Sequence, residues 1–196
     1  KKHTIKKISN GINLQIMKPT ENSIREHFQL HNKKIILGVA SVWDEYKGLQ
    51  TFYGLSKKLS DKYQVVLIGL NKRQKKTKPE NILAVDKISN PVELAKWYTA
   101  ADVYVNASVE ETMGLTTVEA MACGTPVIVM NRTASPELVG DKCGEIVEPG
   151  NLQQLKDAVV NLDKTKEISE YCVHHASTYE KNQQYGEYMK VYSELL

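Results

Sequence analysis

The sequence has few of the residue patterns that mark metal sites, disulfide frameworks or membrane spans. No apolar run among its 196 residues is long enough for a transmembrane helix. The cysteines form no Cys-x-x-Cys pair, which favours reduced thiols and a cytoplasmic location. The histidines lack the spacing of metal ligands, so we expect no bound metal. The residues concerned are Cys123, Cys143 and Cys172, and His3, His27, His31, His174 and His175.

A strong charge of either sign is also missing. The 26 Lys and Arg residues and the 23 Asp and Glu residues give a net charge of +3, which indicates no particular partner. One basic run, at 72–78, contains no aromatic residue, so we expect no nucleic-acid partner. We expect this run to be a solvated surface loop, with a weak contact to anionic membrane lipids as the alternative. Because the chain starts at Lys1 and not at Met, we expect it to be a piece of a longer protein.

Short apolar runs alternate with helical patterns from residue 34 onward, after a polar and basic first segment. Such alternation predicts an α/β fold, a Rossmann-like three-layer sandwich in which helices cover both faces of a parallel sheet. Ligands of such folds bind at the carboxyl ends of the strands. The predicted strands are 35–40, 64–69, 82–85, 102–106, 126–130 and 145–147, and the predicted helices are 49–59, a helix opening at Pro91, 115–123 and a helical tail from Leu152.

The stretch from Ser108 to Val127 carries the most information about function. A strand ends near Asn106, a loop with two glutamates follows, and Gly114 precedes a helix. The exposed N–H groups at a helix start, together with the helix dipole, can hold a phosphate. Gly114 has no Cβ, so an anion could approach the backbone closely there. The pattern therefore favours an anion-binding loop at the edge of the sheet.

Two carboxylates, Glu111 in the loop and Glu119 in the helix, could border the same pocket. Carboxylates accept hydrogen bonds from paired hydroxyls, such as those of a ribose or a sugar ring. The alternative is structural: Thr116 and Glu119 also fit a capping box at a helix start, and Glu111 could be a solvated loop acid. Spacing alone does not decide between these two interpretations.

The spacing of Glu111 and Glu119, with Gly114 between them and Glu-Ala-Met-Ala-Cys-Gly-Thr-Pro-Val from Glu119 onward, resembles the E-x7-E signature of the family 4 (group 1) retaining glycosyltransferases. Complete enzymes of that family have the two-domain GT-B fold, and the resemblance covers nearly the whole chain but one half of such an enzyme. It implies that residues 34–196 form a nucleotide-sugar-binding Rossmann-like domain with C-terminal helices. Residues 1–33 would be a linker from a missing N-terminal acceptor domain. Further segments similar to the family are 9–13, 92–108, 135–139 and 144–147.

The resemblance implies a role for each matched residue. Glu119 would bind the ribose hydroxyls of the nucleotide. Glu111 would contact hydroxyls of the donor sugar, and Lys47 would neutralise the diphosphate leaving group, which makes these two the expected catalytic residues. The other expected donor-binding positions are the backbone near Gly114, Leu115 and Thr116 for the diphosphate, Ser41 beside it, and Ile88 near the base.

One departure from the family pattern concerns the leaving group. The family usually carries an arginine directly after the glycine that ends the first strand, whereas here Val39 follows Gly38. Stabilisation of the leaving group would then fall on Lys47, the helix start and Ser41. The chain also has no Asp-x-Asp sequence, which metal-dependent glycosyltransferases use to hold a divalent ion on the diphosphate. We therefore expect no metal or other cofactor, and a UDP-, GDP- or ADP-sugar as donor.

Together these features predict transfer of a hexose-type sugar from a nucleoside-diphosphate sugar to an acceptor hydroxyl, with retention at the anomeric carbon. We expect a cytoplasmic enzyme of bacterial surface polysaccharide or lipopolysaccharide synthesis, free or peripheral at the inner face of the cell membrane. We expect this chain alone to bind nucleotide without efficient transfer. The alternatives are a non-catalytic nucleotide-binding or docking module and another GT-B enzyme, such as a sugar-nucleotide epimerase, which the E-x7-E spacing disfavours.

Overall fold

A sheet of six parallel strands runs through the middle of the structure, a computed structural model that describes residues 5–195. Residues 1–4, which include His3 and the beginning of the predicted linker, and Leu196 lie outside the described residues. The strand order is β3-β2-β1-β4-β5-β6, so the sheet grows in opposite directions from β1 and from β4. The strands are β1 (Lys34–Val39), β2 (Tyr63–Ile68), β3 (Ile82–Val85), β4 (Val103–Asn106), β5 (Val127–Met130) and β6 (Gly144–Val147).

Each face of the sheet has its own hydrophobic core, because successive residues of a strand point to opposite faces. Ile35 and Leu37 of β1 belong to one core, whereas Ile36 between them belongs to the other. All three side chains are fully buried. The unbroken apolar run at the start of the predicted domain therefore reflects a parallel strand that is covered on both sides.

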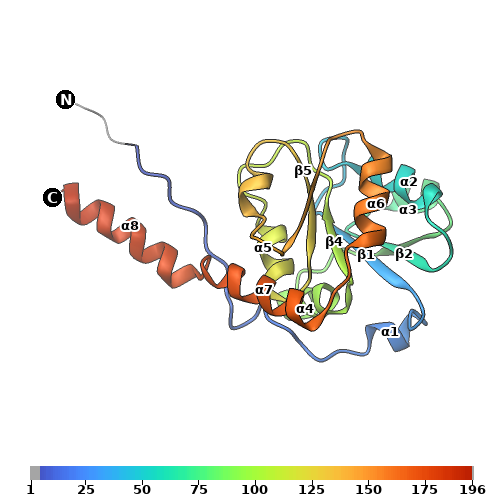
Figure 1. The fold of residues 1–196 in the computed structure, drawn as a ribbon, viewed down its shortest axis with the longest axis horizontal. Coiled ribbons are helices and arrows are strands. Elements are labelled where there is room, and N and C mark those ends of the chain that lie inside the picture. Colours follow the sequence, from blue (N-terminus) through green and yellow to red (C-terminus); the bar gives the residue numbers. More distant parts are fainter. Residues whose placement is uncertain (1–4, 196) are drawn as a thin grey trace.

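Helices cover both faces of the sheet, which confirms the predicted three-layer α/β sandwich (Figure 1). One core contains side chains from α4, α5 and α7, and the other contains side chains from α2 and α6. The predicted strands and helices are present, and their ends differ from the prediction by a single residue at most. The helices are α1 (Ile24–His27), α2 (Leu49–Lys58), α3 (Lys72–Thr77), α4 (Pro91–Ala100), α5 (Leu115–Ala122), the 3-10 helix η1 (Ser135–Leu138), α6 (Leu152–Asn161), α7 (Lys166–Ser177) and α8 (Lys181–Leu195).

The basic run at 72–78 contains a short helix, α3, and is not the loop that we predicted. The Asn71 side chain accepts a hydrogen bond from the Gln74 backbone N–H at 2.9 Å, and the Gln74 side chain accepts one from the Asn71 N–H at 3.0 Å. This reciprocal capping box stabilises the helix start. The Gln74 amide also donates to the Trp43 carbonyl at 2.7 Å, which holds α3 beside the loop after β1. The sequence signal for this helix was the Asn-x-x-Gln spacing of Asn71 and Gln74, which the charge of the run does not reveal.

Part of the segment predicted to be a linker packs on the sheet and its helices. Ile12 and Met17 are buried in the same core as α4 and α5. Arg25 of α1 donates to Asp102 Oδ2 at 2.6 Å, and the same oxygen accepts the Ile35 N–H at 2.6 Å. One carboxylate thus joins α1 to the starts of β1 and β4.

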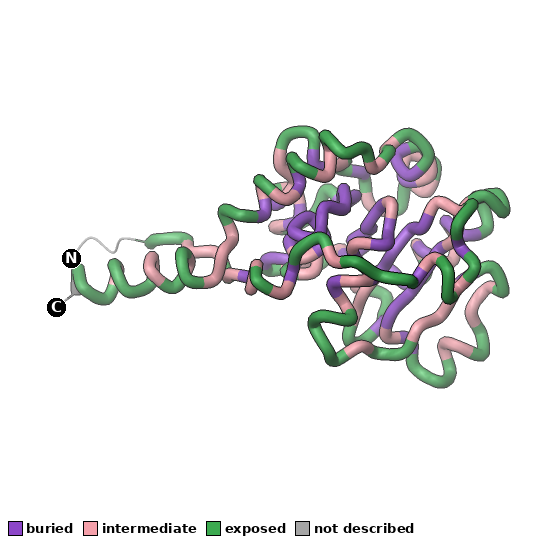
Figure 2. The backbone as a smooth tube through the Cα atoms, turned by 90° about the horizontal axis from the view of Figure 1, so that it is seen from below, coloured by how far each residue is buried: buried purple, intermediate pink, exposed green. Residues whose placement is uncertain are grey.

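The last helix, α8, extends away from the body of the molecule (Figure 1). Residues 181–194 of this helix are exposed or half-buried, in contrast to the buried sheet (Figure 2). Lys6 Nζ lies 3.4 Å from Glu187 Oε2, so the N-terminal segment contacts this helix. Within residues 5–195, no helix combines the length and the apolar character that crossing a membrane requires.

We expect Asp102→Ala to lower the free energy of unfolding by about 2–3 kcal/mol, because it leaves Arg25 and the Ile35 N–H without their shared acceptor. Chemical denaturation measures this change. Asp163→Ala is the matched control: it removes an ion pair with Lys34 in which the carboxylate side chain is 77% exposed. It should lower the free energy of unfolding by less than about 1 kcal/mol. Equal effects of the two substitutions would contradict the anchoring role of Asp102.

Candidate functional site

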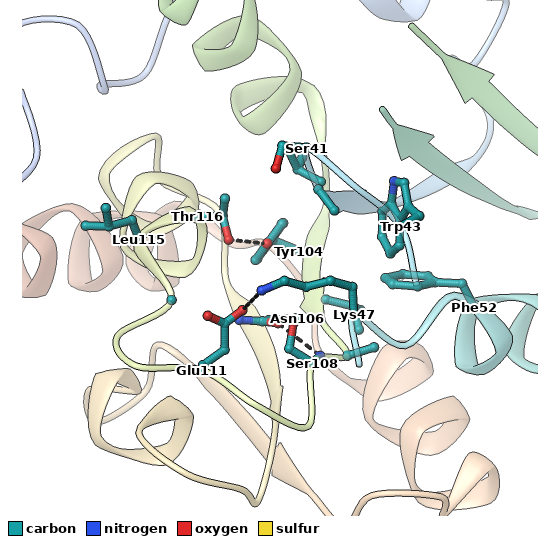
Figure 3. Close-up of a pocket in the computed structure, with 15 residues that line it drawn as sticks. Ser41, Trp43, Lys47, Phe52, Tyr104, Asn106, Ser108, Glu111, Leu115 and Thr116 are labelled. Carbon is teal, nitrogen blue, oxygen red and sulfur yellow. Dashed lines mark hydrogen bonds and ion pairs between the residues drawn. The ribbon is translucent and has the colours of Figure 1, made fainter. Parts of the chain in front are cut away.

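A cleft of about 160 Å³ opens at the carboxyl ends of β1 and β4 (Figure 3). The sheet grows in opposite directions from these two strands, and such a switch point is where doubly wound sheets bind ligands. The lining residues come from the loop after β1, the start of α2, the end of β4 and the start of α5. The cleft therefore lies at the edge of the sheet where the sequence predicts ligand binding.

Helix α2 begins close to the end of β4 because Gly48 has no side chain. The φ angle of Gly48 is 71°, in the left-handed region. A Cβ at this position would lie 2.4 Å from the Ala107 carbonyl oxygen. Glycine tolerates both the left-handed φ angle and the close approach of a neighbouring backbone. The close approach brings Lys47 next to the loop that follows β4, and Trp43 supports the same turn through a 2.8 Å hydrogen bond from its indole N–H to the Ile68 carbonyl.

Lys47 and Glu111 form an ion pair in the cleft, with Nζ 2.7 Å from Oε1 (Figure 3). The Glu111 side chain is 13% exposed and that of Lys47 is 36% exposed, so the carboxylate is the more buried partner. The Glu111 backbone N–H donates to the Thr133 hydroxyl at 3.0 Å, which holds the loop from the other side. Among the described residues, Lys47 is the one cationic side chain that lines the cleft.

The helices that begin at the cleft lack the side-chain caps of most other helices. In α3, α4, α6 and α7, an Asn or Thr side chain accepts a hydrogen bond from a backbone N–H at the helix start. Helix α5 begins instead at Gly114, whose φ is 74°, and no side chain caps it. Helix α2 begins in the same way at Gly48. The first N–H groups of α5 are therefore not occupied by a side chain, as an anion-binding helix start requires.

Thr116 and Glu119, one turn apart on α5, each accept a hydrogen bond from a tyrosine hydroxyl. The Tyr104 hydroxyl donates to Thr116 Oγ1 at 2.7 Å, and the Tyr98 hydroxyl donates to Glu119 Oε2 at 3.0 Å. The capping-box alternative is wrong, because α5 begins at Gly114 and the Glu119 carboxylate is bonded to Tyr98. Burial raises the pKa of Glu119, and the hydrogen bond from Tyr98 lowers it.

The cleft brings together six of the eight predicted site residues. Glu119 and Ile88 are not among the residues that line it. Glu119 lies one turn beyond Thr116 on α5, and half-buried Ile88 packs against the core that contains α4 and α5. Their roles stay predictions. The six residues in the cleft are Ser41, Lys47, Glu111, Gly114, Leu115 and Thr116.

The sequence interpretation missed several polar and aromatic residues of the cleft, among them Trp43, Tyr104, Asn106 and Ser108. Asn106 Nδ2 donates to Thr117 Oγ1 at 3.0 Å, and Asn106 Oδ1 accepts the Ser108 N–H at 3.1 Å. These bonds fix the turn from β4 into the glutamate-bearing loop. The signal for Asn106 was a polar residue at the end of a buried apolar strand, because such a residue needs hydrogen-bond partners.

Within residues 5–195, no group of three or more His, Cys, Asp or Glu side chains could hold a metal ion. Cys123, Cys143 and Cys172 are buried and form no disulfide. Neither observation tests whether the reaction needs a cofactor, so the expectation of a metal-independent donor site stays a prediction.

The chain is similar in sequence to known glycosyltransferases. The family model described as "Glycosyl transferases group 1" matches residues 33–164. The D-inositol 3-phosphate glycosyltransferase of Streptomyces bingchenggensis is 36% identical over 92 residues, which cover 44% of this chain and 20% of that protein. The match thus spans well under half the length of that relative.

Two solved structures are also similar to this chain in fold. The C-terminal domain of a group 1 glycosyltransferase from Francisella tularensis has a TM-score of 0.69 and 27% identity, and the match covers 87% of this chain and 99% of that one. Anabaena HepE, solved in complex with UDP-glucose, has a TM-score of 0.81 and 19% identity over 95% of this chain and 57% of that one, a likeness of fold alone. Because the family model covers more than half of the sequence, this chain belongs to the group 1 glycosyltransferases.

Proposed function

We propose that this domain binds the sugar donor of a retaining, metal-independent glycosyltransferase, which moves a hexose-type sugar from a nucleoside diphosphate to an acceptor hydroxyl. The observation that carries the proposal is the joint presence of Lys47, Glu111 and the uncapped start of α5 in one cleft. A cation and free N–H groups suit a diphosphate, and a carboxylate suits sugar hydroxyls. The UDP-glucose bound to HepE, which has the same fold, supports a sugar nucleotide as ligand.

Negative charge develops on the departing diphosphate as the bond to the sugar breaks. In the proposed mechanism, Lys47 and the N–H groups from Gly114 to Thr116 stabilise that charge, with Ser41 beside them. The departing phosphate helps to take the proton from the acceptor hydroxyl, so this half of the enzyme supplies no general base. Glu119 binds the ribose hydroxyls, and the backbone near Ile88 contacts the nucleobase.

The ion pair between Lys47 and Glu111 implies an exchange of partners when donor binds. Before binding, each charge is neutralised by the other at 2.7 Å. The diphosphate then takes over the Lys47 ammonium, and Glu111 accepts hydroxyl groups of the sugar instead. A nucleotide without a sugar would leave Glu111 without its replacement partners, so the exchange favours the complete donor.

A second domain would complete the enzyme and hold the acceptor. One exposed face of α8 supports such a partner: Tyr185, Tyr188, Met189 and Tyr192 are 59%, 39%, 63% and 60% exposed. Their spacing of three and four residues puts them on one side of the helix. We propose that the missing N-terminal domain covers this face, in a cytoplasmic enzyme of surface polysaccharide or lipopolysaccharide synthesis that is free or peripheral at the membrane.

A non-catalytic nucleotide-binding module is the second candidate. It is favoured because Lys47 is the one cation among the described lining residues, and Val39 stands where the family usually has an arginine. Both candidates bind nucleotide, and they differ in turnover by the protein that contains both domains. An epimerase remains disfavoured by the E-x7-E spacing.

We expect calorimetric titration to detect one preferred nucleotide among UDP, GDP and ADP, with the same affinity with and without magnesium. Glu119→Ala should weaken that nucleotide about ten- to hundredfold, as expected for loss of hydrogen bonds to a charged group. Glu110→Ala, in the loop before α5 and outside the cleft lining, is the control. An unchanged affinity in Glu119→Ala would remove the ribose role, and absence of binding by the wild type would refute a preformed donor site.

We expect Glu111→Gln to bind the free nucleotide as tightly as the wild type or more tightly, because Lys47 is released from its ion pair. The same variant should lose the extra affinity for the sugar nucleotide. Lys47→Ala should weaken both ligands about tenfold or more, since it removes a charge-assisted hydrogen bond and leaves Glu111 beside the diphosphate. Titrations of the two variants and of the double variant measure the coupling. Additive effects would contradict the exchange of partners.

We expect the isolated chain to release no measurable free nucleotide or glycoside product when it is incubated with UDP-glucose or GDP-mannose and simple sugar acceptors. The reason is that acceptor and donor meet between two domains in the proposed enzyme. A coupled assay for released UDP or GDP makes the measurement. Efficient turnover by this chain alone would show that no second domain is needed.

A further inference from the structure

Two buried tyrosines connect α4 and β4 to the proposed ribose-binding side of α5. Tyr98 is 0% exposed and Tyr104 is 1% exposed. Their rings pack edge to face, with centroids 5.6 Å apart and an angle of 76° between the planes. Each hydroxyl donates to a different side chain of α5: Tyr98 to Glu119 and Tyr104 to Thr116. Tyr98 is therefore bonded to the Glu119 carboxylate, and Tyr104, which is bonded to Thr116, serves as a matched control.

We propose that Tyr98 is a positioning residue, which fixes the orientation and the ionised state of Glu119 for binding the donor ribose. The proposal rests on the proposed function of this domain. The ring is fully buried and packs against Tyr104, and its hydroxyl donates to Glu119 Oε2 at 3.0 Å, which orients the carboxylate. Glu119 Oε1 has no hydrogen-bond partner in the described part of the chain, which leaves that oxygen available to a ligand hydroxyl.

The charge on Glu119 needs this support, because its surroundings in the described residues supply no ion pair. The ionisable groups around it are Tyr98 on α4, Tyr104 on β4 and Cys123 at the end of α5. Burial raises the pKa of each, to about 12 for Cys123, so all three are neutral near pH 7. Burial also raises the pKa of Glu119, and the Tyr98 hydrogen bond acts in the opposite direction. Tyr98 thus favours the carboxylate form.

The first test needs no ligand. It follows the titration of the Glu119 carboxyl by NMR in the wild type, in Tyr98→Phe and in Tyr104→Phe. Each substitution removes one hydroxyl and keeps the ring, and thermal unfolding checks that the variants fold. Tyr98→Phe should move the titration midpoint of Glu119 to higher pH, and Tyr104→Phe should leave it in place. An unchanged midpoint in Tyr98→Phe, or equal shifts in both variants, would overturn the proposal.

The second test measures affinity for UDP-glucose and GDP-mannose between pH 5.5 and 8.5. These probes are suitable because both of their phosphates are esterified, whereas a terminal phosphate titrates near pH 6. Tyr98→Phe should weaken binding about three- to tenfold, the range for one hydrogen bond, at the low end of this pH range. The loss should be smaller at the high end, because removing the Tyr98 hydrogen bond raises the pKa of Glu119 and so favours the protonated form mainly at low pH. Glu119→Gln should abolish this pH dependence. A loss of the same size at every pH would indicate a purely structural role for Tyr98 and overturn the proposal.

The two tests separate this inference from the proposed function. If neither probe binds the wild type while Tyr98→Phe shifts the Glu119 titration, the donor-binding function fails and the control of the carboxylate by Tyr98 stands. If the probes bind and the titration does not shift, the donor site stands and the inference on Tyr98 fails. Should Tyr98→Phe not fold, the Glu119 titration is followed with fluorotyrosine at position 98, whose more acidic hydroxyl is a stronger hydrogen-bond donor. A midpoint at lower pH supports the inference, and an unchanged midpoint overturns it.

Discussion

The candidate site depends on how closely the start of α2 approaches the end of β4. A Cβ on Gly48 would lie 2.4 Å from the Ala107 carbonyl oxygen, so a side chain there would push the two elements apart. Lys47 would move with α2, and its 2.7 Å contact with Glu111 would be lost. The loop that carries Glu111 would then keep the Thr133 hydroxyl as its anchor but lose the ion pair. The backbone contact between Gly48 and Ala107 is possible because glycine has no side chain, and this contact positions Lys47 beside Glu111.

The balance of charge in the cleft follows from that geometry. Lys47 is the one cation among the described lining residues, and a diphosphate would bring more negative charge than one lysine can neutralise. The uncapped start of α5 can supply the rest through its N–H groups and the helix dipole. Glu111 offsets Lys47 while the cleft holds no donor, since leaving either charge unpaired in a partly buried place is unfavourable. In the proposed function, binding of a donor would therefore compete with Glu111, and the sugar hydroxyls would supply the compensation.

Local patterns predicted the sheet and the edge at which the cleft lies, whereas Lys47 and Ser41 were predicted from the family resemblance. Apolar runs such as Ile35–Leu37 indicate the buried strands, and Gly114 before an apolar helix predicted the helix start at the cleft. What escaped prediction depends on residues distant in the sequence. Spacing left open whether Glu119 caps a helix, and its actual partner is Tyr98, twenty-one positions away, in a contact that forms only when α4 packs against α5. The helix α3 was missed for a different reason, since a run of lysines outweighed the local signal of Asn71 and Gln74.

Side-chain caps distinguish the two helices that begin at the cleft from four helices that begin elsewhere. An Asn or Thr cap satisfies an N–H that would otherwise lack a partner, and replacing such a cap by Ala costs about 1 kcal/mol, whereas Gly costs only a few tenths. Helices α3, α4, α6 and α7 carry such caps, and α2 and α5 begin at the cleft with Gly48 and Gly114. Glycine is therefore the residue that leaves the N–H groups open to a ligand at the smallest loss of stability. In α2, Gly48 also permits the close contact with the end of β4. The same glycine therefore starts the helix and positions Lys47.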